Sequence, residues 1–242
     1  MNILLVGATG QMGRAVSDLA GSEIVAGIGR SASDFPVYET FKEVTEDVDV
    51  IIDFSTPDLL EDMLNFAEKN KVPVVIATTG YSEAHVSLIE DISNNVPIVY
   101  AGNYSLGINV MEQLAEQIAR TLKNFDIEIT ETHHKFKKDA PSGTANMLFD
   151  AVNHGRDGKL HKLEGRSGMY ESRDQNEVGI SSLRGGTAVG EHSVFFYGED
   201  EIIELKHTAF SKRIFAKGAL EAAEFLVQKE PGLYTVTDVL EG

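Results

Sequence analysis

The sequence has no cysteine among its 242 residues. This absence excludes disulfide bonds, zinc sites built on thiolates and catalysis by a cysteine nucleophile. The seven histidines show neither the His-x-x-x-His spacing nor the histidine and carboxylate spacing of a metal site. We therefore expect no bound metal.

The chain is also short of long apolar runs and of positive charge. No run approaches the roughly 20 apolar residues of a membrane span, and the first residues do not resemble a signal peptide. We therefore expect a cytoplasmic protein without a membrane partner. The formal net charge is −17, with 21 basic against 38 acidic residues. This balance argues against a nucleic-acid partner, because nucleic-acid binding requires a basic surface.

The first thirteen residues, MNILLVGATGQMG, predict a strand, a glycine-rich turn and the start of a helix. The three glycines of this turn follow an apolar strand at residues 2–6, in a variant of the dinucleotide-binding fingerprint. Such glycines let the backbone approach a pyrophosphate at the helix N-terminus. The turn is predicted to bind the cofactor; the alternative is a tight turn without a ligand. The predicted residues are Gly7, Ala8, Thr9, Gly10, Gln11 and Met12.

Further apolar strands are predicted at residues 23–28, 49–54, 72–77 and 96–100, with helical segments between them. This alternation predicts an α/β fold with a Rossmann-like, doubly wound parallel sheet. After the second strand, no acidic residue that would hold the ribose of NAD precedes Asp34, whereas Arg30 is placed to meet a 2′-phosphate. We predict NADPH, or the use of both NADPH and NADH; the alternative is that Arg30 is a surface arginine.

The stretch richest in chemistry is ETHHKFKKDAPSGTA, residues 131–145. Residues 126–131 alternate with a period of two, which predicts a strand, and Ser142 is a natural N-cap for the helix that follows. The N-terminus of that helix offers N–H groups to an anion, beside two imidazoles and three lysines. The pattern favours a carboxylate held next to a titratable imidazole; the alternative is a solvated basic loop.

This string is similar to the signature of the 4-hydroxy-tetrahydrodipicolinate (dihydrodipicolinate) reductase family, E-x-H-H-x-x-K-x-D-A-P-S-G-T-A. The matching positions are Glu131, His133, His134, Lys137, Asp139, Pro141, Ser142, Gly143 and Thr144. The resemblance implies the NAD(P)H-dependent reduction of 4-hydroxy-tetrahydrodipicolinate, a small cyclic dicarboxylate, to tetrahydrodipicolinate. That reaction belongs to the diaminopimelate and lysine biosynthesis pathway.

The resemblance also implies roles for individual residues. His133 is the expected general acid, because an imidazole titrates near pH 6.5, and Lys137 is expected to aid proton donation or to hold the diacid. Asp139 either orients Lys137 or forms a turn. The residues expected to bind a substrate carboxylate are His134, Ser142, Gly143 and Thr144. Those expected to line the nicotinamide side of the cofactor are Ala77, Thr78, Thr79, Ala101, Gly102, Asn103 and Tyr104.

Two domains are expected. Residues 1–104 and 212–242 form the dinucleotide-binding domain, and residues 105–211 form a smaller α+β domain for substrate binding and oligomerisation, with a mixed sheet of about four strands. Residues 155–177 are polar and predict a long loop. The family resemblance implies a homotetramer. Two other functions stay open at this point: another nicotinamide-dependent oxidoreductase of a small anionic substrate, and a non-catalytic NADPH sensor.

Overall fold

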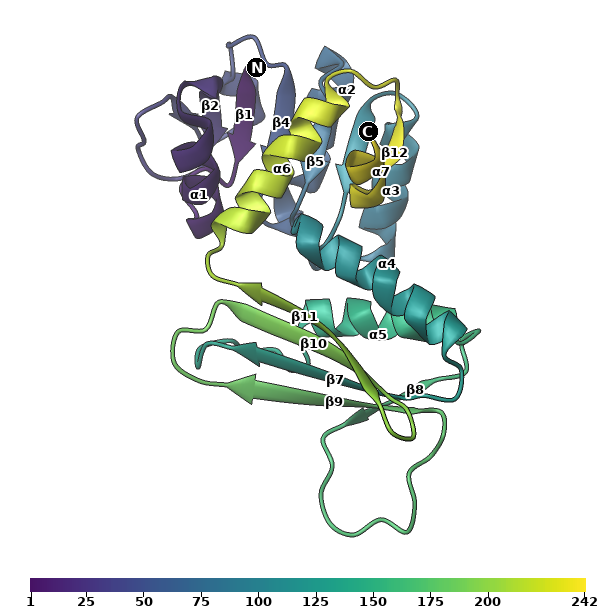
Figure 1. The fold of residues 1–242 in the computed structure, drawn as a ribbon. Helices are drawn as coiled ribbons and strands as arrows, with labels where there is room; N and C mark the ends of the chain where they lie inside the picture. The colour runs from purple at the N-terminus through teal and green to yellow at the C-terminus, as the bar shows by residue number, and fades with distance from the viewer. The chain divides into compact units, whose positions relative to one another are not determined.

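The computed structural model describes all 242 residues. The chain divides into two compact units (Figure 1). Unit 1 consists of Met1–Leu106 and Lys212–Gly242, and unit 2 consists of Gly107–Ser211. Each unit has its own sheet.

Unit 1 is built on a seven-stranded sheet in which every strand pair is parallel. The strand order is β12-β6-β5-β4-β1-β2-β3, which is the doubly wound arrangement predicted from the sequence. The strands are β1 (Ile3–Val6), β2 (Ile24–Ile28), β3 (Val37–Tyr38), β4 (Val50–Asp53), β5 (Val74–Ile76), β6 (Pro97–Tyr100) and β12 (Gly232–Tyr234). The central strands are buried along their whole length, because helices cover both faces of the sheet.

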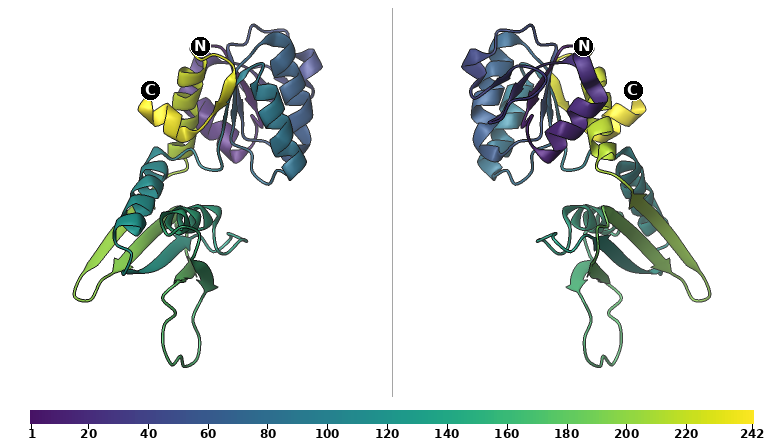
Figure 2. Two further views of the ribbon diagram at one scale, coloured as in Figure 1. Left: turned by 90° about the vertical axis from the view of Figure 1, so that its right-hand side faces the viewer. Right: turned by 90° about the vertical axis from the view of Figure 1, so that its left-hand side faces the viewer.

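Helices lie on both faces of this sheet (Figure 2), and each face carries its own hydrophobic core. On one face lie α1 (Gln11–Ala20), α6 (Arg213–Leu226) and α7 (Val236–Glu241). On the other face lie α2 (Leu60–Asn70) and α3 (Glu83–Ser93). Three short 3₁₀ turns, Gly21–Glu23, Phe41–Glu43 and Pro57–Leu59, lie between these elements.

Helix α6 lies close to its neighbours because its buried face is made of small residues. A Cβ on Gly218 would lie 1.8 Å from the carbonyl oxygen of Tyr104, so only glycine fits there. The hydroxyl of Tyr104 lies 2.9 Å from the carbonyl oxygen of Ile76 and 3.0 Å from that of Val99. The returning C-terminal segment is thereby packed on the segment that follows β6.

Unit 2 contains a five-stranded mixed sheet in the order β11-β10-β7-β9-β8. Its strands are β7 (Asp126–His133), β8 (His161–Glu164), β9 (Glu177–Arg184), β10 (Gly190–Tyr197) and β11 (Ile202–Ala209). Strand β7 pairs in parallel with β9 and antiparallel with β10. Helices α4 (Leu106–Thr121) and α5 (Gly143–Gly155) cover one face, where Ile127 and Ile129 of β7 pack against Ala115 and Leu148.

One strand of unit 2 lies inside the region that the sequence predicts to be a loop. Strand β8 consists of HKLE and is mostly exposed, so it has no hydrophobic periodicity to reveal it. It forms because it pairs with the edge of β9. The rest of that loop is held by Arg166, whose guanidinium donates to Glu128 at 2.6 and 2.7 Å. None of the helices in either unit is both long and apolar enough to span a membrane.

Candidate active site

The cofactor residues predicted in unit 1 lie along one edge of its sheet. In the parallel register, Val6 of β1 lies beside Asp53 of β4, Asp53 beside Ile76 of β5, and Ile76 beside Tyr100 of β6. The turns that follow these strands therefore emerge at the same carboxyl edge. Ligands of open α/β sheets bind at this edge.

The first turn has the geometry of a phosphate cradle. The N–H groups of Gly7 and Ala8 donate to the carbonyl oxygen of Ile28 at 3.0 and 3.1 Å, and Gly7 has a φ of +77°. A Cβ on Gly13 would lie 2.3 Å from the carbonyl oxygen of Gly7, so the helix can pack this closely only without a side chain there. The N-cap of α1 is Gly10, which has no side chain to satisfy the first N–H groups. These groups are available to an anion such as a pyrophosphate.

A hollow of about 320 Å³ lies beyond the end of β2. Its polar lining comprises Arg30, Ser31, Ser33 and Glu39. The arginine and two hydroxyls suit a phosphate, and the carboxylate suits ribose hydroxyls. Glu39 does not follow β2 directly in the sequence, and it reaches the hollow only because β3 pairs with β2.

The other predicted cofactor residues differ in how far they are exposed to solvent. Thr79 and Gly102 are exposed, and a Cβ on Gly102 would contact no other atom within 4 Å. Three are engaged within the protein instead. The Thr78 hydroxyl accepts from the Ser55 N–H at 2.8 Å, Asn103 Oδ1 accepts from the Ser105 N–H at 2.8 Å, and the Tyr104 ring is buried. Ala77 and Ala101 are half-buried.

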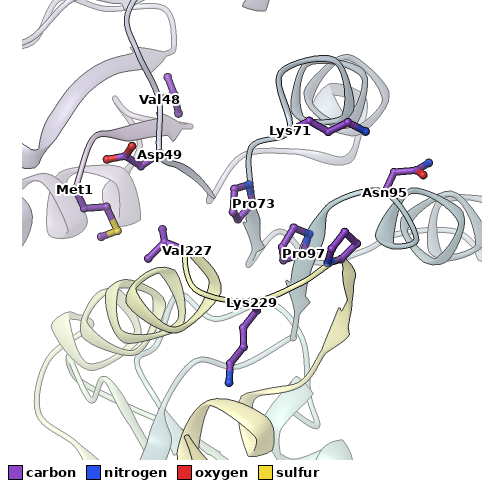
Figure 3. Close-up of a pocket in the computed structure, with 10 residues that line it drawn as sticks. Met1, Val48, Asp49, Lys71, Pro73, Asn95, Pro97, Val227 and Lys229 are labelled. Atoms are coloured by element: carbon purple, nitrogen blue, oxygen red, sulfur yellow. The ribbon is translucent and has the colours of Figure 1, made fainter.

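A larger hollow of about 690 Å³ lies at the opposite, amino edge of the unit 1 sheet (Figure 3). Pro73 and Pro97, at the starts of β5 and β6, form part of it and offer no N–H donors. Lys71 and Lys229 extend away from each other in Figure 3, and the Asp49 carboxylate already accepts the N–H of Asn2 at 2.6 Å. Its polar groups do not converge, unlike those at the carboxyl edge.

In unit 2 the chemistry is centred on a buried carboxylate, Glu131. Its side chain lies on the helix-covered face of β7 with only 1% of its surface exposed. The guanidinium of Arg184 donates to both of its oxygens at 2.7 Å, and the Ser142 N–H donates at 3.2 Å. Burial raises the pKa of the Glu131 carboxyl, but the hydrogen bonds from Arg184, Ser182 and His133 outweigh it and lower the pKa to about 2. Glu131 is therefore ionised at neutral pH.

His133, the predicted general acid, is oriented by this carboxylate. Its Nδ1 lies 2.5 Å from Glu131 Oε2, and an ionised carboxylate can only accept, so Nδ1 carries the proton. Proton exchange is then left to Nε2, beside which Gly190 leaves space: a Cβ there would lie 3.1 Å away. Burial lowers the pKa of His133, and Glu131 only partly offsets this. The imidazole of the ligand-free chain is thus held mostly neutral at pH 7.

Ser142 is the N-cap of α5, as the sequence predicts. The sequence suggested that its hydroxyl binds substrate, but the side chain is buried and its Oγ accepts from the Ala145 N–H at 3.2 Å. The same Oγ lies 3.0 Å from Nε2 of His192. Ser142 therefore acts as the N-cap of α5, while the next residue, Gly143, is exposed and Thr144 is half-buried.

The remaining predicted residues follow β7 in the connecting loop. The Lys137 ammonium pairs with Asp139 Oδ1 at 2.9 Å, which favours the orienting role of Asp139. His134 has a buried Nδ1 without a hydrogen-bond partner within the protein. Two neighbours of the predicted acid lie far from it in the sequence: Arg184 pairs with Glu131, and the His192 ring lies 5.1 Å from the His133 ring.

Because His192 is buried, the free energy of unfolding is expected to depend on pH. Burial, with the neighbouring His133, lowers the pKa of His192 to about 4, against about 6.5 in an unfolded chain. Between these values the unfolded chain binds more protons, so the free energy of unfolding should fall as the pH falls from 6.5 to 4, by up to about 3 kcal/mol from this residue. Urea unfolding across pH 5–7 checks this. His192→Gln should flatten the decline, and equal slopes for the two proteins would contradict the assignment.

Comparison with protein families assigns both parts of the chain. Residues 1–104 match the family model described as dihydrodipicolinate reductase, N-terminus. Residues 107–240 match the model described as dihydrodipicolinate reductase, C-terminus. Together the two matches span nearly the whole chain.

Individual relatives agree with this assignment. The chain is 46% identical over 247 residues to a 4-hydroxy-tetrahydrodipicolinate reductase of Caldanaerobacter subterraneus subsp. tengcongensis, covering 100% of this chain and 98% of the relative. It is 46% identical over 237 residues to the enzyme of the same name from Brachyspira hyodysenteriae, covering 98% and 99%. Among solved structures, a dipicolinate-bound dihydrodipicolinate reductase from Paenisporosarcina sp. TG-14 has the same fold, with a TM-score of 0.80 at 22% identity over 97% of each chain.

Proposed function

The chain belongs to the 4-hydroxy-tetrahydrodipicolinate reductase family, and we propose that it reduces this cyclic diacid to tetrahydrodipicolinate with His133 and Lys137 as its catalytic residues. The enzyme is a nicotinamide-dependent oxidoreductase of diaminopimelate and lysine biosynthesis. The observation that carries the residue assignment is the buried Glu131 carboxylate, which fixes the tautomer of His133 next to the exposed end of α5.

In this proposal unit 1 holds the cofactor and unit 2 holds the diacid. The exposed N–H groups at the start of α1 suit the pyrophosphate, and Thr79 and Gly102 are placed at the edge where the nicotinamide would lie. When bound, the cofactor supplies the hydride. In unit 2, Gly143 and Thr144 at the start of α5 would hold one carboxylate of the diacid, with His134 offering its unpartnered Nδ1.

The proton comes from the protein. His133 donates from Nε2, because Nδ1 is committed to Glu131. The pKa of His133 is lowered in the free chain, but a bound dicarboxylate places negative charge near the imidazole and favours its protonated form. Substrate binding therefore raises the pKa of His133 and increases the fraction of the imidazole that carries the proton to be donated. Lys137 adds a positive charge that stabilises negative charge developing on the ring nitrogen.

The direct test is oxidation of NADPH, and separately of NADH, by the purified protein with enzymatically generated 4-hydroxy-tetrahydrodipicolinate. Rapid, diacid-dependent loss of the absorbance of the reduced nicotinamide is the expected result. A protein that binds either nucleotide yet leaves the diacid unreduced would sink the proposal.

We further propose that the enzyme uses NADPH as well as NADH, since the hollow after β2 carries groups for both. Arg30→Ala should raise KM for NADPH about 10-fold, the loss expected of one charge-assisted contact, and leave KM for NADH within about two-fold. Glu39→Gln is the matched variant and should raise KM for NADH alone. Equal effects of Arg30→Ala on both cofactors would contradict contact with a 2′-phosphate.

The uncovered face of the unit 2 sheet supports a homo-oligomer, which we propose is the tetramer implied by the family. This face lies opposite α4 and α5 and exposes large apolar side chains. Leu183, Tyr197 and Ile202 are 57%, 37% and 60% exposed. Tyr197 and Ile202 are paired at one end of this face and Leu183 lies near the other end, and exposed apolar side chains spread over a sheet face favour burial against a second copy. Light scattering should give four times the chain mass, and Ile202→Asp should reduce it; a monomeric wild type would contradict the proposal.

A further inference from the structure

Unit 1 contains a buried carboxyl group to which no role has been given. Asp53 ends β4 and has 1% of its surface exposed, in a strand that otherwise reads Val-Ile-Ile. No arginine or lysine pairs with it. Burial raises the pKa of its carboxyl above the usual range, so keeping this group costs stability that an aliphatic residue would not. Because this loss of stability brings no gain in packing, we infer that the Asp53 carboxyl has another role.

All hydrogen-bond donors to Asp53 come from turns at the carboxyl edge. Oδ1 accepts the N–H of Ser55 at 3.0 Å and its hydroxyl at 2.5 Å, and Oδ2 accepts the hydroxyl of Tyr81 at 3.3 Å. The hydroxyl of Thr78 accepts the same N–H of Ser55 at 2.8 Å, and it lowers the pKa of the Asp53 carboxyl. One carboxylate therefore joins the turn after β4 to the turn after β5.

The two residues held in the second turn flank its exposed part. Thr78 comes before Thr79 and Gly80, and Tyr81 comes after them. The Tyr81 ring is held from the other side by edge contacts with Tyr100 and His85, at centroid distances of 5.8 and 5.6 Å. Gly80 has a φ of +86°, which lets the chain turn sharply between the two anchors. The backbone of Thr79 and Gly80 is thus fixed at both ends.

We propose that Asp53 is a positioning residue for the nicotinamide dinucleotide: it holds Thr78 and Tyr81 so that the intervening Thr79–Gly80 backbone is presented at the carboxyl edge in one conformation. This rests on the proposed function in so far as that turn contacts the cofactor. Fixing the turn before binding removes an ordering cost that the cofactor would otherwise have to meet.

The test is the dissociation constant of NADPH, measured by nucleotide fluorescence without any diacid. Asp53→Asn keeps the shape but places an NH₂ group among donors, and it should raise this constant about 10-fold. At saturating NADPH, KM for the diacid should stay within two-fold of wild type. Asp49→Asn is the matched control, because Asp49 flanks the other end of β4 and also accepts a backbone N–H, from Asn2. It should lower thermal stability without changing the dissociation constant.

Two milder variants keep the carboxylate, and they test the same inference if Asp53→Asn does not fold. Ser55→Ala and Tyr81→Phe should each raise the dissociation constant about three-fold, and Ser55→Thr, which restores the hydroxyl, should recover it. Variants that lose thermal stability but bind NADPH within two-fold of wild type would overturn the inference, as would a wild type that binds neither nucleotide. A wild type that binds NADPH without reducing the diacid would instead overturn the proposed function alone.

Discussion

Replacing Lys137 with alanine is expected to lower kcat by about 10²- to 10³-fold, the loss typical of removing one preorganised donor to a developing charge. The Lys137 side chain is only 22% exposed and is held by Asp139 at 2.9 Å, so its charge is fixed in position before substrate arrives. Because the residue belongs to unit 2, the dissociation constant of NADPH should stay within two-fold. Steady-state turnover and nucleotide fluorescence measure the two quantities.

The same loop supplies the control for Lys137. Lys138 is the next residue and is exposed, and Lys138→Ala removes the same formal charge without removing the held ammonium. Its kcat should stay within about two-fold of wild type. The kcat of Asp139→Asn should lie between those of Lys137→Ala and Lys138→Ala, because this change frees the Lys137 ammonium without removing it. If Lys138→Ala were as damaging as Lys137→Ala, the effect would be one of overall loop charge and not of a catalytic group.

The parts of this fold that the sequence predicts are those that local chemistry determines. The apolar run before Gly7 and the glycine turn after it define a strand, a turn and a helix within twenty residues. The period of two in β7 and the cap at Ser142 do the same for unit 2. In each of these cases the residues that decide the structure are neighbours in sequence.

The parts that the sequence does not predict depend on strand register. Arg184 reaches Glu131 because β9 pairs in parallel with β7, and His192 lies beside Glu131 because β10 pairs with it on the other side. These partners lie more than fifty residues from Glu131 in the chain, and their own residue pattern does not show that they meet it. The lowered pKa of His133 has the same origin, since burial is a property of the assembled sheet and helices.

His133→Gln should lower kcat by about 10²- to 10⁴-fold, the usual contribution of a general acid, and should also change the shape of the pH profile. In wild type the protonated imidazole is the active form, so activity falls as the pH rises through its pKa. That pKa is lowered in the free chain, so kcat/KM should begin to fall below pH 6.5. The bound dicarboxylate raises it, so the corresponding fall in kcat should come at higher pH. In the glutamine variant both of these declines should disappear.

Glu131→Gln separates the acid from the group that orients it. The Glu131 carboxylate raises the pKa of His133, so Glu131→Gln should move the decline in kcat/KM to still lower pH. The decline itself should remain, whereas it should disappear when the imidazole is removed. The variant also leaves the Arg184 guanidinium without its charged partner and should lose about 3 to 5 kcal/mol of unfolding free energy, which urea unfolding can measure. If His133→Gln kept the wild-type decline of activity with pH, the titrating acid would lie elsewhere, and the Lys137 ammonium would be the group to test next.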